Sequence, residues 1–429
     1  MAIKRPQGTQ DILPRQTALW QYVEEKIRSL CRRCGYEEIR TPILEATELF
    51  QRGVGMETDI VNKEMFTFRD KGDRSLTLRP EGTAAVARAY AEHKLYGQTP
   101  PWKLYYLGPM FRYEKPQAGR FHQFHQFGLE ALGTADPLAD AEAIWLAWTL
   151  GAELGLRGLA LQLNSVGCPL CREKHRAALT AFLAPQSADL CPDCLVRLDR
   201  NPLRVLDCKN ENCRARTAGA PALPDYLCPE CREHFAAVRS YLDELRLPYQ
   251  LNERLVRGLD YYRKTAFEIL APGLGAQNAI CGGGRYDGLV EEIGGPPTPG
   301  VGFALGLERL LGALAEQNTT PSLTEPPCYV LAALGPEARR WSAGLAAELR
   351  AAGFVVLMDL EGRSLKSQLK FADRRRAAFT LICGEDELAR GNVLARDMRT
   401  GEQREIPRAD LLREMENSIS KERRVKSKE

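Results

Sequence analysis

Polar and aromatic residues are interspersed along residues 121–132, which read FHQFHQFGLEAL. Alternate residues of a β-strand share a face, so Gln126, Gly128 and Glu130 are expected on one side with an open polar slot over the glycine. Arg112 lies on the preceding aromatic segment, KLYYLGPMFRYE. Such a face is either a solvated sheet surface or a ligand pocket, and the density of aromatic residues favours the pocket.

Three further short motifs carry charge beside glycine. Residues 79–83, RPEGT, open a helix that Thr83 is expected to cap. Residues 255–262, LVRGLDYY, combine an Arg, an Asp and two Tyr, although a loop with a salt bridge would look similar. Residues 306–309, GLER, begin a helix after an apolar strand, where an Arg adds to the positive end of the helix dipole and favours phosphate. Neither a P-loop nor a dinucleotide fingerprint is present.

Eight of the 13 cysteines fall between Cys168 and Cys231. Three C-x2-C pairs and one C-x4-C pair are present: Cys168/Cys171, Cys191/Cys194, Cys208/Cys213 and Cys228/Cys231. This spacing is typical of knuckles in which four thiolates hold Zn²⁺. Free cysteines that pack as small core residues would give the same spacing, and both interpretations stay open.

The elements that must position these residues can be read from periodicity. Apolar residues at helical spacing predict a first helix that ends at Gly35, and the two aromatic segments predict a long antiparallel hairpin. An extended segment, 36–44, contains Pro42, which indicates an edge or an interrupted ladder. Residues 165–235 form an insertion, and the Pro- and Thr-rich residues 315–327 a linker. Beyond it the pattern is βαβαβ, which predicts a small parallel sheet.

Length and charge bound the class of protein. The 429 residues allow two to four domains, and no apolar run is long enough for a membrane helix. The N-terminus has no secretory h-region, so we expect a cytoplasmic protein. Residues 326–429 carry 20 Lys and Arg against 16 Asp and Glu, a mild basic surplus that permits a nucleic-acid partner. Residues 421–429 are expected to form a frayed tail.

The motifs, taken in order, resemble those of histidyl-tRNA synthetases, which are class II aminoacyl-tRNA synthetases. The motifs are TPILE, LRPEGTA, GPMFRYEKPQAGRFHQFHQFGLE, LVRGLDYY, AICGGGRYDGL and GVGFALGLERL. The resemblance implies an α+β catalytic domain on an antiparallel sheet, residues 1–325, with the cysteine-rich insertion at about 165–235. It also implies an α/β anticodon-binding domain, residues 326–429, and a homodimer with the motif around Pro42 at its interface.

The resemblance further implies a two-step ligase reaction. Histidine and ATP would form histidyl-adenylate and pyrophosphate, and the histidyl group would pass to the 3′ end of tRNA(His). Mg²⁺ would accompany ATP. The catalytic residues would be Arg112, Arg257 and Arg309. Those around ATP would be Arg112, Glu114, Arg120, Phe124 and Arg309. Those against L-histidine would be Glu81, Gly82, Thr83, Arg112, Gln126, Glu130, Arg257, Tyr261 and Tyr262.

Two other functions account for part of the sequence. Some bacteria use a related, non-catalytic chain as a regulatory subunit of ATP phosphoribosyltransferase, but such chains typically lack the C-terminal domain and have eroded motifs. Here Arg112, Arg257 and Arg309 are all present. A zinc-knuckle nucleic-acid-binding module would explain residues 168–231 and leave the polar hairpin face unexplained.

Overall fold

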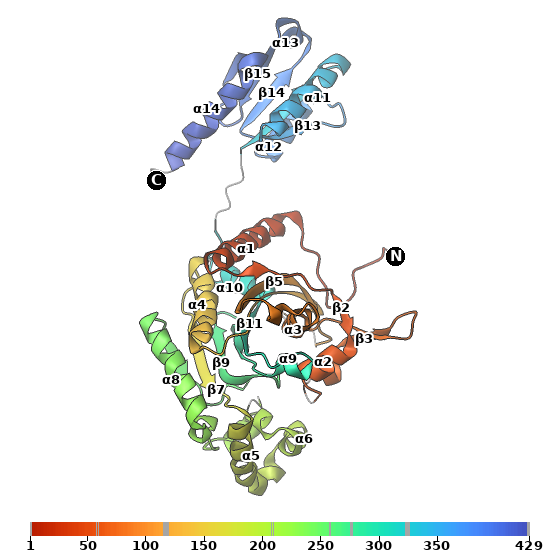
Figure 1. The fold of residues 1–429 in the computed structure, drawn as a ribbon. Helices are drawn as coiled ribbons and strands as arrows, with labels where there is room; N and C mark the ends of the chain where they lie inside the picture. Colours follow the sequence, from red (N-terminus) through yellow and green to blue (C-terminus); the bar gives the residue numbers. More distant parts are fainter. Residues whose placement is uncertain are drawn as a thin grey trace. The chain divides into compact units, whose positions relative to one another are not determined.

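The computed structural model describes residues 2–56, 58, 60–114, 120–206, 208, 210–256, 259–274, 278–321 and 327–426 (Figure 1). It separates into two compact units, Met1–Pro321 and Ser322–Glu429. The boundary lies inside the Pro- and Thr-rich segment 315–327, because that composition offers no periodic apolar face to pack.

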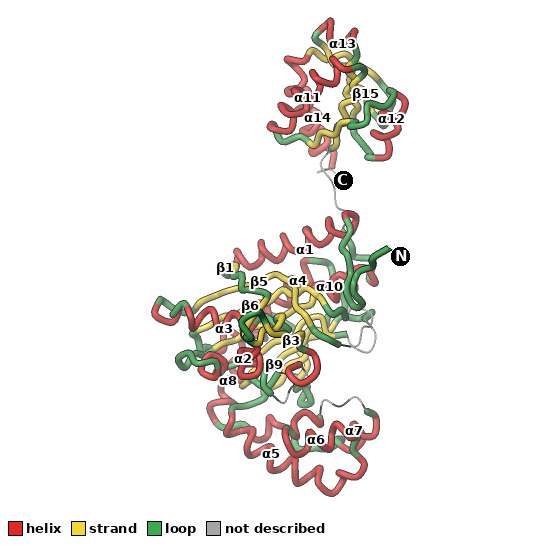
Figure 2. Tube along the Cα trace, turned by 90° about the vertical axis from the view of Figure 1, so that its right-hand side faces the viewer, coloured by secondary structure: helices red, strands yellow, loops and turns green. Residues whose placement is uncertain are grey.

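A mainly antiparallel eight-stranded sheet forms the centre of the first unit (Figures 1 and 2). The strand order is β1-β5-β6-β11-β10-β9-β7-β8. The strands are β1 (Glu37–Glu38), β5 (Trp102–Phe111), β6 (Gln123–Leu132), β7 (Ala160–Ser165), β8 (Tyr249–Leu251), β9 (Arg263–Leu270), β10 (Ala279–Arg285) and β11 (Gly300–Gly306). β1 and β8 pair in parallel with β5 and β7, and the other neighbours are antiparallel. The expected antiparallel catalytic fold is confirmed.

The two faces of this sheet differ, as the alternation along β6 requires. Phe127 and Leu129 are fully buried in the main core together with residues of four helices. These helices are α1 (Pro14–Arg33), α4 (Pro137–Glu153), α8 (Pro229–Glu244) and α10 (Leu307–Glu316). The opposite face contributes Tyr106 to a second core with α3 (Thr83–Glu92) and α9 (Leu289–Glu292). The polar side chains of β6 lie on this second face.

The predicted first helix and hairpin are both present. α1 ends just before Gly35, whose φ of 73° suits glycine. β5 and β6 pair over their full length, and residues 115–119 between them lie outside the described part. Pro42 falls in the break between β1, an edge strand, and β2 (Leu44–Ala46). β2 joins a separate three-stranded sheet with β4 (Ser75–Leu78) and β3 (Phe66–Arg69), beside α2 (Thr47–Gly53) and a π-helical turn (Ile60–Glu64).

The insertion consists of helices with two small cores of their own. Its helices before α8 are α5 (Pro169–Leu183), α6 (Pro192–Arg200) and α7 (Glu211–Arg216). Short 3-10 turns connect them at Ala184–Asp189, Pro202–Val205 and Leu223–Tyr226. Each of α5, α6 and α8 begins directly after a cysteine, with proline at its first position, where the missing N–H costs nothing.

The second unit contains the predicted βαβαβ pattern and a hairpin that was not predicted. β12 (Cys328–Ala333), α11 (Pro336–Ala351), β13 (Val355–Met358), α12 (Leu365–Arg374) and β14 (Phe379–Cys383) give three parallel strands. α13 (Glu385–Arg390) follows, and then β15 (Asn392–Asp397) and β16 (Gln403–Pro407) extend the sheet antiparallel. The predicted parallel sheet is confirmed for β12, β13 and β14, and the antiparallel strands β15 and β16 extend it. β16 is an exposed polar edge strand without a clear apolar alternation, so no pattern in the sequence predicts it.

The chain ends in α14 (Arg408–Lys426). The backbone of residues 421–426 is thus helical where a frayed tail was expected, and residues 427–429 lie outside the described part. None of the described helices combines the length and the apolar character that crossing a membrane would require.

Candidate active site

A cavity of about 660 Å³ opens in the first unit, within the size range of small-molecule sites. Six of the residues proposed from the sequence line it: Arg112, Glu114, Arg120, Phe124, Gln126 and Arg309. Arg257 and Gly258 lie outside the described residues, but Leu255 and Val256, which precede them, line the same cavity. Segments that are nearly 200 residues apart therefore meet around one space.

Arg112 is held in place from two sides. Its Nε donates to the carbonyl oxygen of Pro80 at 2.9 Å, and its guanidinium carbon lies 5.3 Å from the centre of the Phe124 ring. Arg120 pairs with the carboxylate of Glu114, which is also 3.8 Å from Arg112. A planar guanidinium fixed in this way is suited to binding a phosphate or carboxylate in a defined orientation.

Arg309 lies in the first turn of α10. Burial, and next the positive charge of Arg120, lower the pKa of Arg309, so the two guanidinium groups influence one another. The backbone N–H of His125 donates one hydrogen bond that is shared between the two carboxylate oxygens of Glu308, at 2.9 and 3.0 Å, and this bond fastens α10 to β6. The described lining residues include five arginines and three glutamates, so the cavity carries a net positive charge that suits a polyphosphate.

Glu130 is buried on the polar face of β6. Its two oxygens accept hydrogen bonds from the hydroxyl of Thr83, at 2.7 Å, and from the hydroxyl of Tyr286. Burial raises the pKa of Glu130 to about 8, against the effect of these two hydrogen bonds. A carboxylate has room for about four hydrogen bonds, so Glu130 retains acceptor capacity.

Glu81, and not Thr83, accepts hydrogen bonds from the free N–H groups at the start of α3. Its two oxygens accept from the backbone N–H groups of Thr83 and Ala84, each at 2.8 Å. The expectation that Thr83 caps this helix is wrong, because its hydroxyl donates to Glu130 instead. Burial raises the pKa of Glu81, and the helix N-terminus and nearby Arg112 favour its charged form.

Tyr106 fills the slot that was expected to be open over Gly128. The two residues are directly paired across β5 and β6, and a Cβ atom on Gly128 would lie 2.0 Å from the Tyr106 ring. A Cβ on Gly82 would meet the same ring at 2.2 Å, so both glycines are needed for close approach. Among the described residues, the buried Tyr106 hydroxyl and the Gln126 Oε1 atom have no hydrogen-bond partner. Two such orphaned polar atoms indicate a place for a polar ligand.

Tyrosines from two distant motifs meet beside this cluster. Tyr261 and Tyr262 are buried with ring centres 4.7 Å apart, and Tyr286 lies 5.7 Å from Tyr261. Sequence reasoning missed Tyr106 and Tyr286. Pairing the hairpin residue by residue would have placed Tyr106 opposite Gly128, whereas no local signal joins Tyr286 to Glu130.

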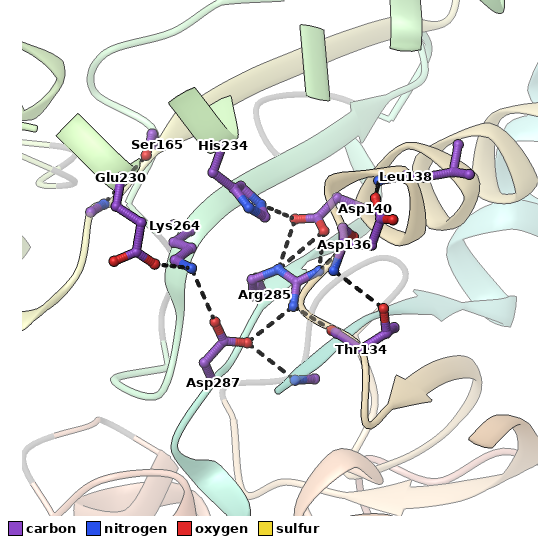
Figure 3. A network of polar contacts seen from close by, with 12 residues as sticks. Thr134, Asp136, Leu138, Asp140, Ser165, Glu230, His234, Lys264, Arg285 and Asp287 are labelled. Carbon is purple, nitrogen blue, oxygen red and sulfur yellow. Dashed lines mark hydrogen bonds and ion pairs between the residues drawn. The ribbon is translucent and has the colours of Figure 1, made fainter. Parts of the chain in front are cut away.

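A buried ionic network holds β10, and with it Tyr286, to α4 and α8 (Figure 3). The guanidinium of Arg285 is fully buried and pairs with Asp140 of α4. It also donates to the carbonyl oxygen of Thr134 at 2.8 Å and to Asp287 at 3.1 Å. His234 of α8 approaches Asp140 at 3.3 Å. Because Arg285, Asp140 and His234 are all buried, the network fixes β10 against α4 and α8.

The eight cysteines of the insertion separate into two groups of four. The outer group is Cys168, Cys171, Cys228 and Cys231, and the inner group is Cys191, Cys194, Cys208 and Cys213. Within each group all sulfur atoms lie within 4.8 Å of one another. In the outer group the Cys168 sulfur lies 3.5 Å from that of Cys171 and 3.9 Å from that of Cys228, and in the inner group the sulfurs of Cys191 and Cys208 are 3.9 Å apart. Four thiolates about 2.3 Å from one Zn²⁺ would be about 3.8 Å apart, so both groups have the dimensions of a metal site.

The fold and the site define a class II aminoacyl-tRNA synthetase: a mainly antiparallel sheet with an arginine-rich cavity on one face, and a separate α/β unit. Family models agree, since the model for histidyl-tRNA synthetase matches residues 8–310 and the model for the anticodon binding domain matches residues 329–418. The chain belongs to the histidyl-tRNA synthetase family.

Individual relatives support this assignment over nearly the full chain. The histidine–tRNA ligase of Desulfitobacterium hafniense is 58% identical over 411 residues, 96% of this chain and 97% of that protein. The histidine–tRNA ligase of Halothermothrix orenii is 51% identical over 98% of this chain and 100% of its own length. The crystal structure of apo histidyl-tRNA synthetase from S. aureus superposes with a TM-score of 0.82 at 40% identity, and covers 96% of this chain and 99% of that one.

Proposed function

We propose that the chain is a histidine–tRNA ligase, which activates L-histidine with ATP and transfers it to the 3′ end of tRNA(His). The observation that carries this proposal is the position of the arginine-lined cavity beside the buried cluster around Glu130. The first feature suits a triphosphate and the second suits a small polar side chain. The relatives named above, which match over almost their whole length, are histidine–tRNA ligases.

In the first step the carboxylate of histidine attacks the α-phosphorus of ATP, a P–O bond forms, and pyrophosphate leaves. Arg112 holds the α-phosphate and the attacking carboxylate together, and Arg309 holds the γ-phosphate from the end of α10. Arg257 completes the catalytic set at the α-phosphate. Fixed cations stabilise the charge that develops at phosphorus, which accounts for most of the rate. Mg²⁺ would accompany ATP and would supply further positive charge at the phosphates.

Further residues hold the rest of ATP and the amino acid. Glu114, Arg120 and Phe124 frame ATP, with the Phe124 ring against the adenine. Gln126, whose Oε1 is otherwise unpartnered, accepts from the α-amino group together with Glu81. Glu130 and a tyrosine hydroxyl, from Tyr261 or Tyr262, bind the two imidazole nitrogens, with Gly82 and Thr83 beside them. Such paired polar contacts discriminate against analogues that lack them by about 10⁴-fold or more.

Residues 1–325 would act as the catalytic domain, with the insertion at about 165–235, and residues 326–429 would bind the anticodon of tRNA(His). The mild positive charge of residues 326–429 supports an RNA partner. The presence of both family domains on one chain argues against a role as a regulatory subunit of ATP phosphoribosyltransferase. We place the enzyme in the cytoplasm, where its tRNA substrate is charged.

The enzyme would function as a homodimer whose interface includes the segment around Pro42. Ile43 and Leu44, next to this proline, expose 42% and 44% of their surface, and Phe68 of the same small sheet exposes 45%. Exposed large apolar side chains on one small sheet and the segment before it are candidates for an interface between subunits. Light scattering of Leu44→Glu should show monomers where the wild-type chain shows dimers.

The two cysteine groups would hold structural Zn²⁺, one ion each. The sulfur separations fit a tetrahedral ion, and in each group a backbone N–H donates to sulfur: Cys228 to Cys171 at 3.1 Å and Cys191 to Cys213 at 3.2 Å. Such bonds stabilise thiolates. The apolar cores of the insertion are small, and zinc binding would supply part of the free energy that keeps the insertion folded.

Histidine-dependent ATP–pyrophosphate exchange tests the proposed roles. Arg257→Ala and Arg112→Ala should each nearly abolish the exchange while circular dichroism remains unchanged. Arg340→Ala, an arginine of the second unit, is the matched control and should retain the wild-type rate. An Arg257→Ala enzyme with near-normal exchange would remove that residue from the mechanism, and aminoacylation of tRNA with labelled histidine tests the second step.

A further inference from the structure

The inner cysteine group lies against the candidate active site. Cys208 itself lines the cavity, together with Leu206 before it and Arg214 after the last cysteine of the group. Four cysteine pairs can combine into two groups in three ways, and the structure brings the inner two pairs together. The inner group therefore joins Cys191 and Cys194, at the start of α6, to Cys208 and Cys213, and Cys208 forms part of the cavity wall.

Two hydrogen bonds fasten this part of the insertion to the rest of the site. α6, which begins at the inner group, is followed by Asn201, whose Nδ2 donates to Asp260 Oδ1 at 3.1 Å. Asp260 directly precedes Tyr261. Arg254, which lines the cavity, donates to the carbonyl oxygen of Thr217 at 3.0 Å, just after α7. The inner group is thus tied both to the cavity and to the tyrosine segment.

The apolar core behind this wall is small. The core around the inner group contains seven buried residues, two of which are cysteines of the group itself: Leu179, Leu183, Leu190, Cys194, Val205, Leu206 and Cys213. A core of this size stabilises a folded segment weakly, and small domains of this kind usually depend on a metal or disulfide. The fold of residues 191–214 would therefore depend on what joins the four sulfurs.

We propose that the inner cysteine group is a zinc site that positions the wall of the catalytic cavity, and that its metal holds Arg214 where it binds the phosphates of ATP. Arg214 directly follows Cys213, so fixing that sulfur fixes the start of the arginine side chain. The side chain is exposed and lines the cavity, where its charge adds to those of Arg112, Arg120 and Arg309. The proposal rests on the proposed function, since it takes ATP as the ligand of that cavity.

The test begins with the metal content of the full chain. Elemental analysis should find two zinc ions per chain in the wild type and one in Cys191→Ser/Cys194→Ser. In the same variant, hydrogen exchange should become faster in residues 204–214 and 252–256. The KM for ATP in the pyrophosphate exchange should rise about tenfold, with a smaller change in kcat, because a binding contact is lost.

Two arginine variants test the role of the wall without changing the cysteines that would bind zinc. Arg214→Ala should retain two zinc ions and show the same rise in the KM for ATP. Arg216→Ala is the matched control, since Arg216 lies on the same short helix but pairs with Asp189 and does not line the cavity. It should leave both the zinc content and the KM at the wild-type values.

The outcomes separate this inference from the proposed function. A wild-type chain without zinc, or an equal zinc content in the wild type and Cys191→Ser/Cys194→Ser, would overturn the inner metal site. An unchanged KM for ATP in both Cys191→Ser/Cys194→Ser and Arg214→Ala would overturn the role of the wall, while histidine-dependent exchange would still support the ligase. Absence of exchange in the wild-type enzyme would overturn the proposed function, whatever its zinc content.

Discussion

Replacing Glu130 with glutamine would remove a carboxyl group that titrates inside the protein. The pKa of Glu130 rises from 4.5 to about 8, chiefly through burial. A carboxyl group whose pKa is raised on folding contributes stability that is complete below pH 4.5 and is lost as the pH rises through 8. As the pH rises from below 4.5 to above 8, the free energy of unfolding falls by about 5 kcal/mol, and roughly 3 kcal/mol of this fall has occurred by pH 7. Glutamine does not titrate, and its amide can still bond Thr83 and Tyr286.

Thermal unfolding between pH 5.5 and 8.5 measures this difference. The wild-type first unit should lose about 3 kcal/mol more than Glu130→Gln over this range, a relative fall in Tm of roughly 5 °C. Carboxyl groups with a lowered pKa, such as Asp140, titrate below the range and do not interfere. Parallel stability profiles of the two proteins would refute the reasoning, since they would show that the Glu130 carboxyl does not change its protonation there.

Three further substitutions have definite expected outcomes. Asp140→Asn removes the fully buried one of the two carboxylates that pair with the Arg285 guanidinium, and calorimetry should show the first unit destabilised by about 3–5 kcal/mol, with the transition of the second unit unchanged as internal reference. Gly128→Ala sets a methyl carbon 2.0 Å from the Tyr106 ring; denaturant unfolding should show a loss of about 1–3 kcal/mol, and the KM for histidine should rise. A Cβ atom at Gly344 would meet nothing within 4 Å, and Gly344 is exposed on α11, so Gly344→Ala should stabilise the second unit by about 0.5–1 kcal/mol with the KM for histidine unchanged. A normal histidine KM in Gly128→Ala, or wild-type stability in Asp140→Asn, would contradict the packing described.

Much of the fold could be predicted because its signals are local. α1 has buried Val23, Ile27 and Leu30 at helical spacing, and Gly35 ends it. The βαβ pattern after the linker is equally regular. The hairpin of β15 and β16 was missed because β16 is exposed along almost its whole length and has no apolar alternation to detect.

The candidate site was predicted as a set of residues and not as a set of contacts. Arg112 and Arg309 do line one cavity, as the motifs suggested. The predictions of an open slot over Gly128 and of a helix cap at Thr83 were wrong for the same reason. In each case a side chain from another element occupies the position or binds the group. Tyr106 comes from the neighbouring strand, and Glu130, which takes the Thr83 hydroxyl, comes from the far strand of the hairpin.

The sequence by itself determined the family, the order of the motifs and which side chains are available for chemistry. Only the tertiary structure decided which atoms meet. Glu130 receives hydrogen bonds from residues 47 and 156 positions away, and the eight cysteines separate into nested groups of four. Contacts of this kind depend on strand register and on how helices pack across a sheet, and periodicity along the chain reports the face of an element but not the partner that covers it.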